Sequence, residues 1–177
     1  FKYKKNITID AKNSGTLGRL LLGLLINSPY EIKLIGDKSL SNRDFKRVSD
    51  PLTEFGAKFN LKKNKNLPLK ICGSNNLNSI IYFEKKGSAQ CKSAVMFGAM
   101  RSGGTTFIKA KKSRNHTELL CKYLNLPVSV KSKKNHDEIR VSKVNFVKPL
   151  MYTIPSDISS SAFFMVLTAL SHNSRLK

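Results

Sequence analysis

The sequence predicts an α/β protein built from a repeated supersecondary unit. Helical hydrophobic spacing alternates with short strand-like runs, and turns of small residues at Ser14, Ser88 and Ser159 precede three predicted helices. Two arginines, Arg43 and Arg114, lie at matching places 71 positions apart (114 minus 43). The predicted unit is strand, turn, helix, strand, loop with arginine, helix, strand, strand. Such units could share one core and place helix N-termini and arginines on the same face.

The stretch from residue 12 to residue 25 predicts the first helix. A turn of small polar residues leads into leucines at helical spacing, which predicts one buried face made of Leu17, Leu20, Leu21, Leu24 and Leu25. Asn13, Ser14 and Thr16 are typical of a helix N-cap. Unpaired N–H groups at that end, together with Arg19, would attract an anion. The alternative is an ordinary capped core helix with a solvated arginine, and this stretch by itself favours it.

The remaining elements are predicted from the same two periodicities. We expect a loop over 36–43, a helix over 45–55 with a kink or two short turns at Pro51, and Gly56 as its C-terminal stop. Further helices are expected over 94–100, 114–124 and 162–170, the last after a turn over 156–161. Strands are expected over 7–9, 31–35, 58–61, 67–73, 79–83, 105–110, 128–130, 138–141 and 152–154.

The composition indicates a globular protein with a strongly positive surface. The chain has 177 residues, 40% of them hydrophobic, and a formal net charge of +21 from 32 Lys and Arg against 11 Asp and Glu. Nucleic acid is the first partner that such a charge suggests. The lysines are spread along the chain instead of forming one stripe, which weakens that interpretation. Small anionic substrates would be attracted by the same positive potential. Biased codon usage would produce the same composition without any function.

Cysteine and histidine patterns predict no metal site and no disulfide framework. Cys72, Cys91 and Cys121 are odd in number and lack CxxC spacing, so we expect reduced core thiols in a cytoplasmic protein. The three histidines lack metal-ligand spacing. No apolar run approaches the roughly 20 residues of a membrane span, and no signal peptide opens the chain. Because the chain begins and stops inside predicted patterns, we expect it to be part of a longer protein.

Five segments resemble one family, in order and in spacing. They are NSGTLGRLLLGLL, LIGDKSLSNRDFKRVSDPLTEFGA, GSAQCKSAVMFGAM, SRNHTELL and IPSDISSSAFF. Together they resemble 5-enolpyruvylshikimate-3-phosphate synthases over Ile7 to about Leu170. The SAQ and SRNHTE segments are most similar to the glyphosate-tolerant bacterial class. Each segment alone is a weak match, but the five in register are a specific one.

The resemblance implies a fold and a reaction. The family has two domains, each made of three β-α-β-α-β-β units arranged as an inside-out α/β barrel with its helices in the middle. Residues 1–155 would then be most of the N-terminal domain, with repeats at about 1–83 and 84–155. Residues 156–177 would start a third unit or cross to the missing second domain. The implied reaction transfers the carboxyvinyl group of phosphoenolpyruvate to the 5-hydroxyl of shikimate 3-phosphate through a tetrahedral intermediate, without a cofactor.

The resemblance also implies site residues, carried over motif by motif. Phosphoenolpyruvate would bind Asn13, Gly15, Arg43 and Gln90. Shikimate 3-phosphate would bind Ser88, Ala89, Gln90, Ser113 and Arg114. Thr16, Arg19 and Asp157 would support them, and no catalytic residue falls in this chain. Without the resemblance, Ser88 is only an N-cap and Gln90 a solvated residue. We expect His116 to be structural and Lys92 to be a solvated helix residue.

Departures from the family pattern limit what this chain can do alone. An early Lys-Ser pair and a following arginine would lie before Phe1, and the acid-base residues of the second domain would lie beyond Lys177. Asp44 replaces a usual proline, and Ser156 replaces a usual glycine. We therefore expect no turnover and weak substrate binding by the chain alone. The tolerant class has alanine where this chain has Gly15, so a complete enzyme of this type is expected to be inhibited by glyphosate.

Three alternatives remain at this point. A UDP-N-acetylglucosamine enolpyruvyl transferase shares the fold, but its loop carries a reactive cysteine that the segment GDKSLSNR lacks. A basic nucleic-acid-binding module is suggested by charge alone, and the aromatic residues here fall mainly on apolar faces. The third alternative is an inert half-domain that acts only through a partner chain with the missing pieces.

Overall fold

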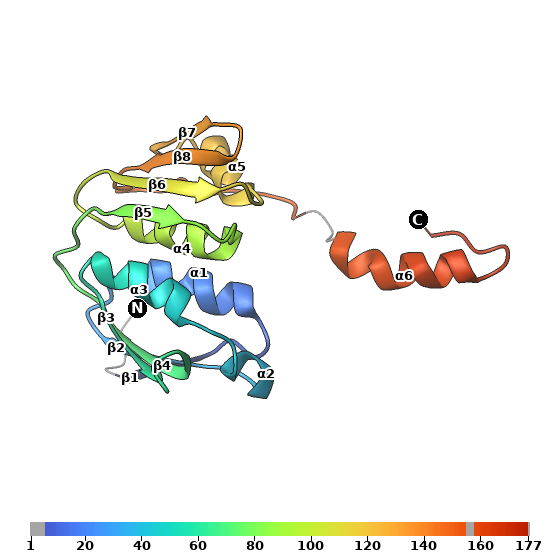
Figure 1. Cartoon of the computed structure of the whole chain (residues 1–177), viewed down its shortest axis with the longest axis horizontal. Helices are drawn as coiled ribbons and strands as arrows, with labels where there is room; N and C mark the ends of the chain where they lie inside the picture. Colours follow the sequence, from blue (N-terminus) through green and yellow to red (C-terminus); the bar gives the residue numbers. More distant parts are fainter. Residues whose placement is uncertain (1–5, 155–157, 177) are drawn as a thin grey trace. The chain divides into compact units, whose positions relative to one another are not determined.

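The computed structural model describes residues 6–154 and 158–176. These residues form two compact parts, which divide between Val147 and Lys148, and each is described by itself. Asp157 and Ser156 lie outside the described residues. The first part contains two four-stranded sheets and five helices, and the second contains the helix α6 (Ile158–Leu170) (Figure 1).

Each sheet belongs to one repeat. The first repeat consists of β1 (Asn6–Asp10), α1 (Gly15–Leu25), β2 (Glu31–Ile35), α2 (Lys38–Ser41), α3 (Lys46–Glu54), β3 (Lys58–Lys62) and β4 (Asn66–Cys72). The second consists of β5 (Ile81–Glu84), α4 (Ala89–Ala99), β6 (Thr106–Lys111), α5 (His116–Tyr123), β7 (Val128–Ser132) and β8 (His136–Val141).

The two repeats have the same topology. The strand orders are β1-β2-β4-β3 and β5-β6-β8-β7, and in each sheet the first two strands are parallel while the other pairs are antiparallel. Both first helices begin with a serine N-cap. The Ser14 hydroxyl accepts from Leu17 N at 3.1 Å, and the Ser88 hydroxyl accepts from Cys91 N at 3.3 Å. The repeat predicted from the sequence is confirmed in these two copies.

Helices α1, α3 and α4 lie between the two sheets (Figure 1). The apolar residues of α3 and its flanks have the predicted helical spacing and are all fully buried: Phe45, Val48, Leu52 and Phe55. Pro51 lies inside one continuous helix, so the predicted break into two short turns is wrong. The lost hydrogen bond is offset because Pro51 and its neighbours Val48 and Leu52 are buried in the core. Gly56, at φ +113°, ends this segment as expected.

The buried face of α1 differs from the prediction. Its buried residues are Gly15, Gly18, Leu22 and Gly23, whereas Leu17 is 46% exposed and Leu24 is 47% exposed. A Cβ added at Gly23 would lie 2.1 Å from the backbone oxygen of Ala94 on α4. The prediction of a buried leucine face is wrong because Gly23 allows the α4 backbone to approach and Gly18 faces the Phe45 ring, which buries the glycine side of α1.

Local predictions also need correction at three other places. The segment expected to be a loop contains α2, whose first turn is capped by Asp37 accepting from Leu40 N at 2.7 Å. Residues 152–154 form no strand. Helix α6 starts at Ile158, so Ser159 lies inside the helix and not in a turn. Small residues are compatible with a first helical turn as well as with a loop, which is why the third predicted turn is wrong.

Cysteine burial leads to a labelling prediction. Cys91 and Cys121 are buried, but Cys72 is exposed, which corrects the expectation of three core thiols. Burial raises the pKa of Cys121 to about 11. A water-soluble disulfide reagent at pH 8 is expected to label one thiol per folded chain within minutes. The Cys72→Ser variant should lose that fast phase, and retention of a fast phase in the variant would contradict the structure.

No described helix is long and apolar enough to cross a membrane. No group of three or more His, Cys, Asp or Glu among the described residues could hold a metal ion.

Candidate active site

Two guanidinium groups flank Gly15 at the N-terminus of α1. A Cβ added at Gly15 would lie 2.9 Å from Arg19 Nη1 and 3.1 Å from Arg43 Nη1. Arg43 comes from the segment between α2 and α3, and its Nη2 donates to Asn13 Oδ1 at 3.3 Å. The sequence-predicted residues Asn13, Gly15 and Arg43 therefore lie together at the N-terminus of α1, where an anion would meet the two guanidinium groups.

Arg19 is half-buried beneath this point. Its guanidinium lies 5.3 Å from the centroid of the Phe45 ring, and its Nη1 donates to Gln90 Oε1 at 2.7 Å. Burial lowers the pKa of Arg19, and the positive charges of Arg43 and Arg47 also lower it. An arginine nevertheless stays protonated in proteins, so two cations are held beside each other. This arrangement favours an anion between or in front of them.

Gln90 connects the two repeats. It lies in the first turn of α4, where its Oε1 accepts from Arg19 and its Nε2 donates to Thr16 Oγ1 at 2.8 Å. Both ends of the amide are therefore bound to α1, so the interpretation of Gln90 as a solvated residue is wrong. The N-termini of α1 and α4 meet through this side chain.

Arg114 lies on the other side of Gln90. A cavity of about 210 Å³ is lined by Thr16, Leu20, Ala89, Gln90, Ser93, Arg114, His116 and Thr117. Together with the contacts around Gly15, this cavity brings residues of both repeats to one place. His116, expected to be structural, is exposed and lines the cavity.

Ser88 is the N-cap of α4, and its backbone amide already has a hydrogen-bond partner. Its backbone N–H donates to the buried Glu84 at 2.9 Å, and its hydroxyl accepts from Cys91 N. Among the described residues the hydroxyl donates to no group, so its proton is available to an acceptor. The N-cap role read from the sequence is confirmed. The Glu84 carboxylate means that an anion at this helix end would meet the Ser88 side chain and not its amide.

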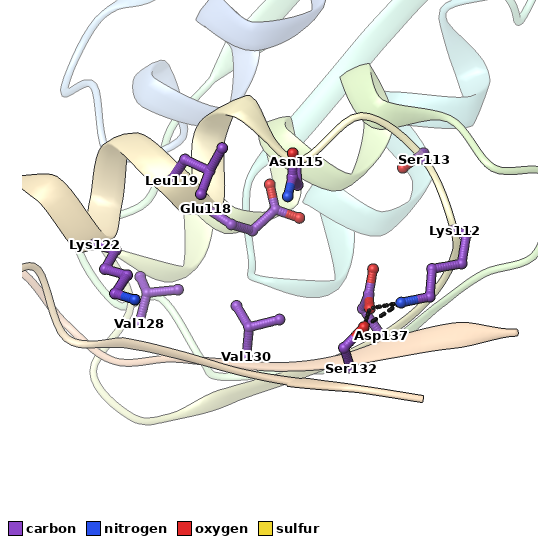
Figure 2. A pocket seen from close by; sticks show the side chains of 10 residues that line it. All are labelled: Lys112, Ser113, Asn115, Glu118, Leu119, Lys122, Val128, Val130, Ser132 and Asp137. Carbon is purple, nitrogen blue, oxygen red and sulfur yellow. Dashed lines mark hydrogen bonds and ion pairs between the residues drawn. The ribbon is translucent and has the colours of Figure 1, made fainter. Parts of the chain in front are cut away.

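Ser113 lines a different cavity from its neighbour Arg114. This second cavity, about 510 Å³, lies between α5 and the β7–β8 hairpin (Figure 2). The Ser113 hydroxyl is buried and has no hydrogen-bond partner among the described residues. The structure therefore does not bring Ser113 into the cavity that Gln90 and Arg114 share.

A charged cluster closes one end of this second cavity (Figure 2). Asp137 accepts from Lys112 Nζ and from the Ser132 hydroxyl, both at 2.7 Å. Burial by itself would raise the pKa of Asp137, but the hydrogen bonds from Lys112 and Ser132 hold it below its ordinary value. Lys112 is thus partly neutralised and does not add to the cationic site around Gly15.

Sequence reasoning missed Lys92. Its side chain is 1% exposed, and its Nζ lies 2.5 Å from Oε1 of Glu118, which is 6% exposed. It also donates to the backbone oxygen of Arg114 at 3.0 Å. The expectation of a solvated residue is wrong because α4 is apolar on nearly all sides and most of it is buried. That all-round apolar pattern was the available signal, since it leaves no solvent-facing stripe for a lysine.

These observations define an α/β repeat protein with a cationic site between the first helices of its two repeats. Comparisons with known proteins agree. The family model "EPSP synthase (3-phosphoshikimate 1-carboxyvinyltransferase)" matches residues 1–176. The 3-phosphoshikimate 1-carboxyvinyltransferase of Caldicellulosiruptor saccharolyticus is 41% identical over 95% of this chain, and that of Leuconostoc mesenteroides is 39% identical over 95%.

Solved structures give the same answer. An EPSP synthase from Acinetobacter baumannii superposes with a TM-score of 0.78 and 32% identity over 92% of this chain. The chain belongs to the EPSP synthase family. It spans about two fifths of the length of the curated relatives it matches, 39% and 38% for the two above, and 36% of the A. baumannii chain. The family match favours the EPSP synthase family over a UDP-N-acetylglucosamine enolpyruvyl transferase and over a basic nucleic-acid-binding module.

Proposed function

We propose that this chain contributes the anion-binding part of an enzyme that transfers the carboxyvinyl group of phosphoenolpyruvate to the 5-hydroxyl of shikimate 3-phosphate. The observation that carries the proposal is Gln90, which joins the N-terminus of α4 to Arg19 and Thr16 of α1. Both substrates are phosphorylated acids, and the site gathers fixed positive charge at two helix N-termini. We expect the enzyme to be cytoplasmic, to bind neither nucleic acid nor a membrane, and to use no cofactor.

Phosphoenolpyruvate is assigned to the side of α1. Arg43 has a fork of donors that can pair with a carboxylate or a phosphate, which a lysine cannot copy. Its Nη2 already contacts Asn13, so both residues would face the same ligand. Gly15 keeps this face open, because a Cβ there would crowd both guanidinium groups. Arg19 and Thr16 would support Gln90 from below, in contact with the amide more than with the substrate.

Shikimate 3-phosphate is assigned to the cavity beside Arg114. Ala89 and Gln90 line this cavity together with Arg114, and the Ser88 hydroxyl has a proton to donate. Ser113 would join them only after a rearrangement of the segment before α5, since Ser113 lines the neighbouring cavity and its hydroxyl is buried. Asp157 is kept as a supporting residue on the resemblance alone.

Proton transfer is assigned to residues outside this chain. The described residues bind and orient charge, and the proposal places no catalytic residue among them. Residues 1–155 would be part of the N-terminal domain, and 156–177 would lead to a third unit or to the second domain. A companion domain would then complete the site and exclude water from it.

The first test uses the chain by itself. Purified chain with both substrates is expected to release no phosphate above the background without protein. Titration with shikimate 3-phosphate should nevertheless shift the NMR signals of Gln90 and Arg114, with weak affinity. Phosphate release would contradict the assignment of catalysis to missing residues. Shifts confined to unrelated surfaces would contradict the proposed site.

A chimaera tests the activity. This chain replaces the matching segment of the C. saccharolyticus relative, and the product is expressed in bacteria that lack their own enzyme. Growth without aromatic amino acids is expected, and the same chimaera with Arg43→Met should fail to grow. Folded, soluble chimaera without growth would count against the proposal. Growth of the Arg43→Met chimaera would count against the role of Arg43.

Replacing Gly15 with alanine tests the phosphoenolpyruvate side. The new methyl group would press on Arg19 and Arg43, so both guanidinium groups must shift by a few tenths of an ångström. We expect glyphosate to inhibit the chimaera. In the Gly15→Ala chimaera we expect weaker inhibition and a KM for phosphoenolpyruvate that is raised about 10-fold, equivalent to roughly 1.4 kcal/mol. The KM for shikimate 3-phosphate should change little. Steady-state kinetics check both values, and equal changes in the two KM values would contradict the assignment.

A further inference from the structure

We propose that the buried ion pair of Lys92 and Glu118 holds the backbone of Arg114 in the position from which its side chain binds the substrate. The inference rests on the proposed function for the identity of the ligand, shikimate 3-phosphate. The fixing of the Arg114 backbone by Lys92 rests on the contacts alone. Neither Lys92 nor Glu118 lines the cavity assigned to the substrate. They are positioning residues that act through the backbone of Arg114.

Lys92 is placed where a charge is costly. It lies two residues after Gln90 on α4, 1% exposed, in a helix whose other buried residues are almost all small or apolar. A buried ammonium group is tolerated only when it is paired and hydrogen-bonded. Lys92 meets both needs with groups from α5 and the segment before it.

One ammonium group holds both the first turn of α5 and the residue that carries the cation of the site. Nζ lies 2.5 Å from Glu118 Oε1 and donates to Arg114 O at 3.0 Å. Neither Glu118 oxygen has a hydrogen-bond partner by geometry among the described residues, so this contact is an ion pair whose strength is Coulombic. The position of Arg114 relative to α4 therefore depends on Lys92.

A second contact links α4 to α5 next to this ion pair. The hydroxyl groups of Ser93 on α4 and Thr117 on α5 lie 2.7 Å apart. Consecutive residues of α4 thus bind consecutive residues of α5. In contrast, Asn115 makes no side-chain cap for α5. Lys92 thus holds the segment before α5 to α4, and Ser93 holds the first turn of α5 to α4.

The side chain of Arg114 remains available. It is exposed, and it has no hydrogen bond or ion pair among the residues that the structure describes. Its backbone is thus fixed by Lys92 while its guanidinium lies beside the cavity that Ala89 and Gln90 also line. A backbone that is already fixed loses less entropy when the guanidinium binds an anion.

An apolar replacement separates positioning from stability. Replacing a buried ion pair by apolar residues of similar volume is often neutral or stabilising, so the double variant Lys92→Met with Glu118→Met is expected to fold. It lacks the donor to Arg114 O. We expect the backbone order parameter of Arg114 in the 177-residue chain to fall from about 0.85 to below about 0.6.

Ligand binding should follow the loss of order. If the competent arrangement of Arg114 is then populated about a tenth of the time, the Kd for shikimate 3-phosphate rises about 10-fold. Val48→Ala is the matched control, because Val48 is fully buried and belongs to α3 of the first repeat, whereas Arg114 belongs to the second. Its Kd and its Arg114 order parameter should equal those of the unchanged chain.

The outcomes distinguish the two proposals. An unchanged Arg114 order parameter in the double variant, or a Kd within twofold of the unchanged chain, overturns the positioning role. The same losses in Val48→Ala would also overturn it, since they would then reflect general loosening. If the unchanged chain binds no shikimate 3-phosphate, the proposed function fails, and the order parameter alone decides the positioning role.

Discussion

Lys92→Met alone is expected to lower the free energy of unfolding by about 3–5 kcal/mol. The substitution removes the one cation that is paired with the Glu118 carboxylate among the described residues, and it leaves that charge, 6% exposed, buried without compensation. It also leaves the backbone oxygen of Arg114 without its donor. Urea unfolding followed by circular dichroism measures the change.

The double variant with Glu118→Met is the control for this prediction. It should regain most of the lost stability, because no unpaired charge remains in the interior. A double-mutant cycle then gives the coupling between the two side chains. A single variant within about 1 kcal/mol of the unchanged chain would show that the carboxylate finds another partner or takes up a proton, contrary to the geometry found here.

Gly23→Ala is expected to separate α1 from α4 and to lower the free energy of unfolding by about 3 kcal/mol or more. Its Cβ would lie 2.1 Å from the oxygen, 2.9 Å from the carbon and 3.1 Å from the Cα of Ala94. All three are backbone atoms, so no side-chain rotation relieves the overlap. The better helix propensity of alanine, worth about 1 kcal/mol, is too small to offset it.

Thermal unfolding checks the prediction for Gly23. For a chain of this size, the loss corresponds to a Tm lower by at least about 6 °C. Gly103→Ala is the matched control, because the nearest atom to its Cβ would be Leu77 O at 3.6 Å, an ordinary contact. Its Tm should stay within about 2 °C of the unchanged chain. Equal losses in the two variants would mean that glycine matters here for the unfolded state and not for helix contact.

Local predictions succeeded where the deciding interactions are local. The Ser14 and Ser88 caps involve an amide three residues away in each helix, and the buried face of α3 follows from spacings of three and four residues. The repeat could be predicted because both copies keep the serine cap before the first helix. Predictions from turn composition failed at Ser159, since small residues suit a helix start as well as a loop.

The candidate site was predictable as a set of residues but not as a geometry. The resemblance named Gly15, Arg43, Gln90 and Arg114, and the structure brings them to the N-termini of α1 and α4. The resemblance could not predict that Ser113 lines the neighbouring cavity. Two adjacent residues on a turn can face opposite sides, and only the packing of α5 on the hairpin decides which.

By itself, the sequence determined the succession of helices and strands, their caps, and the duplication of one unit, because these depend on neighbours within one helical turn or one strand. The tertiary structure decided which side of α1 is buried, that Lys92 is paired inside the protein, and that Gln90 reaches Arg19, 71 positions away. The physical reason is the close approach of two helix backbones at Gly23, which places groups from different repeats in contact.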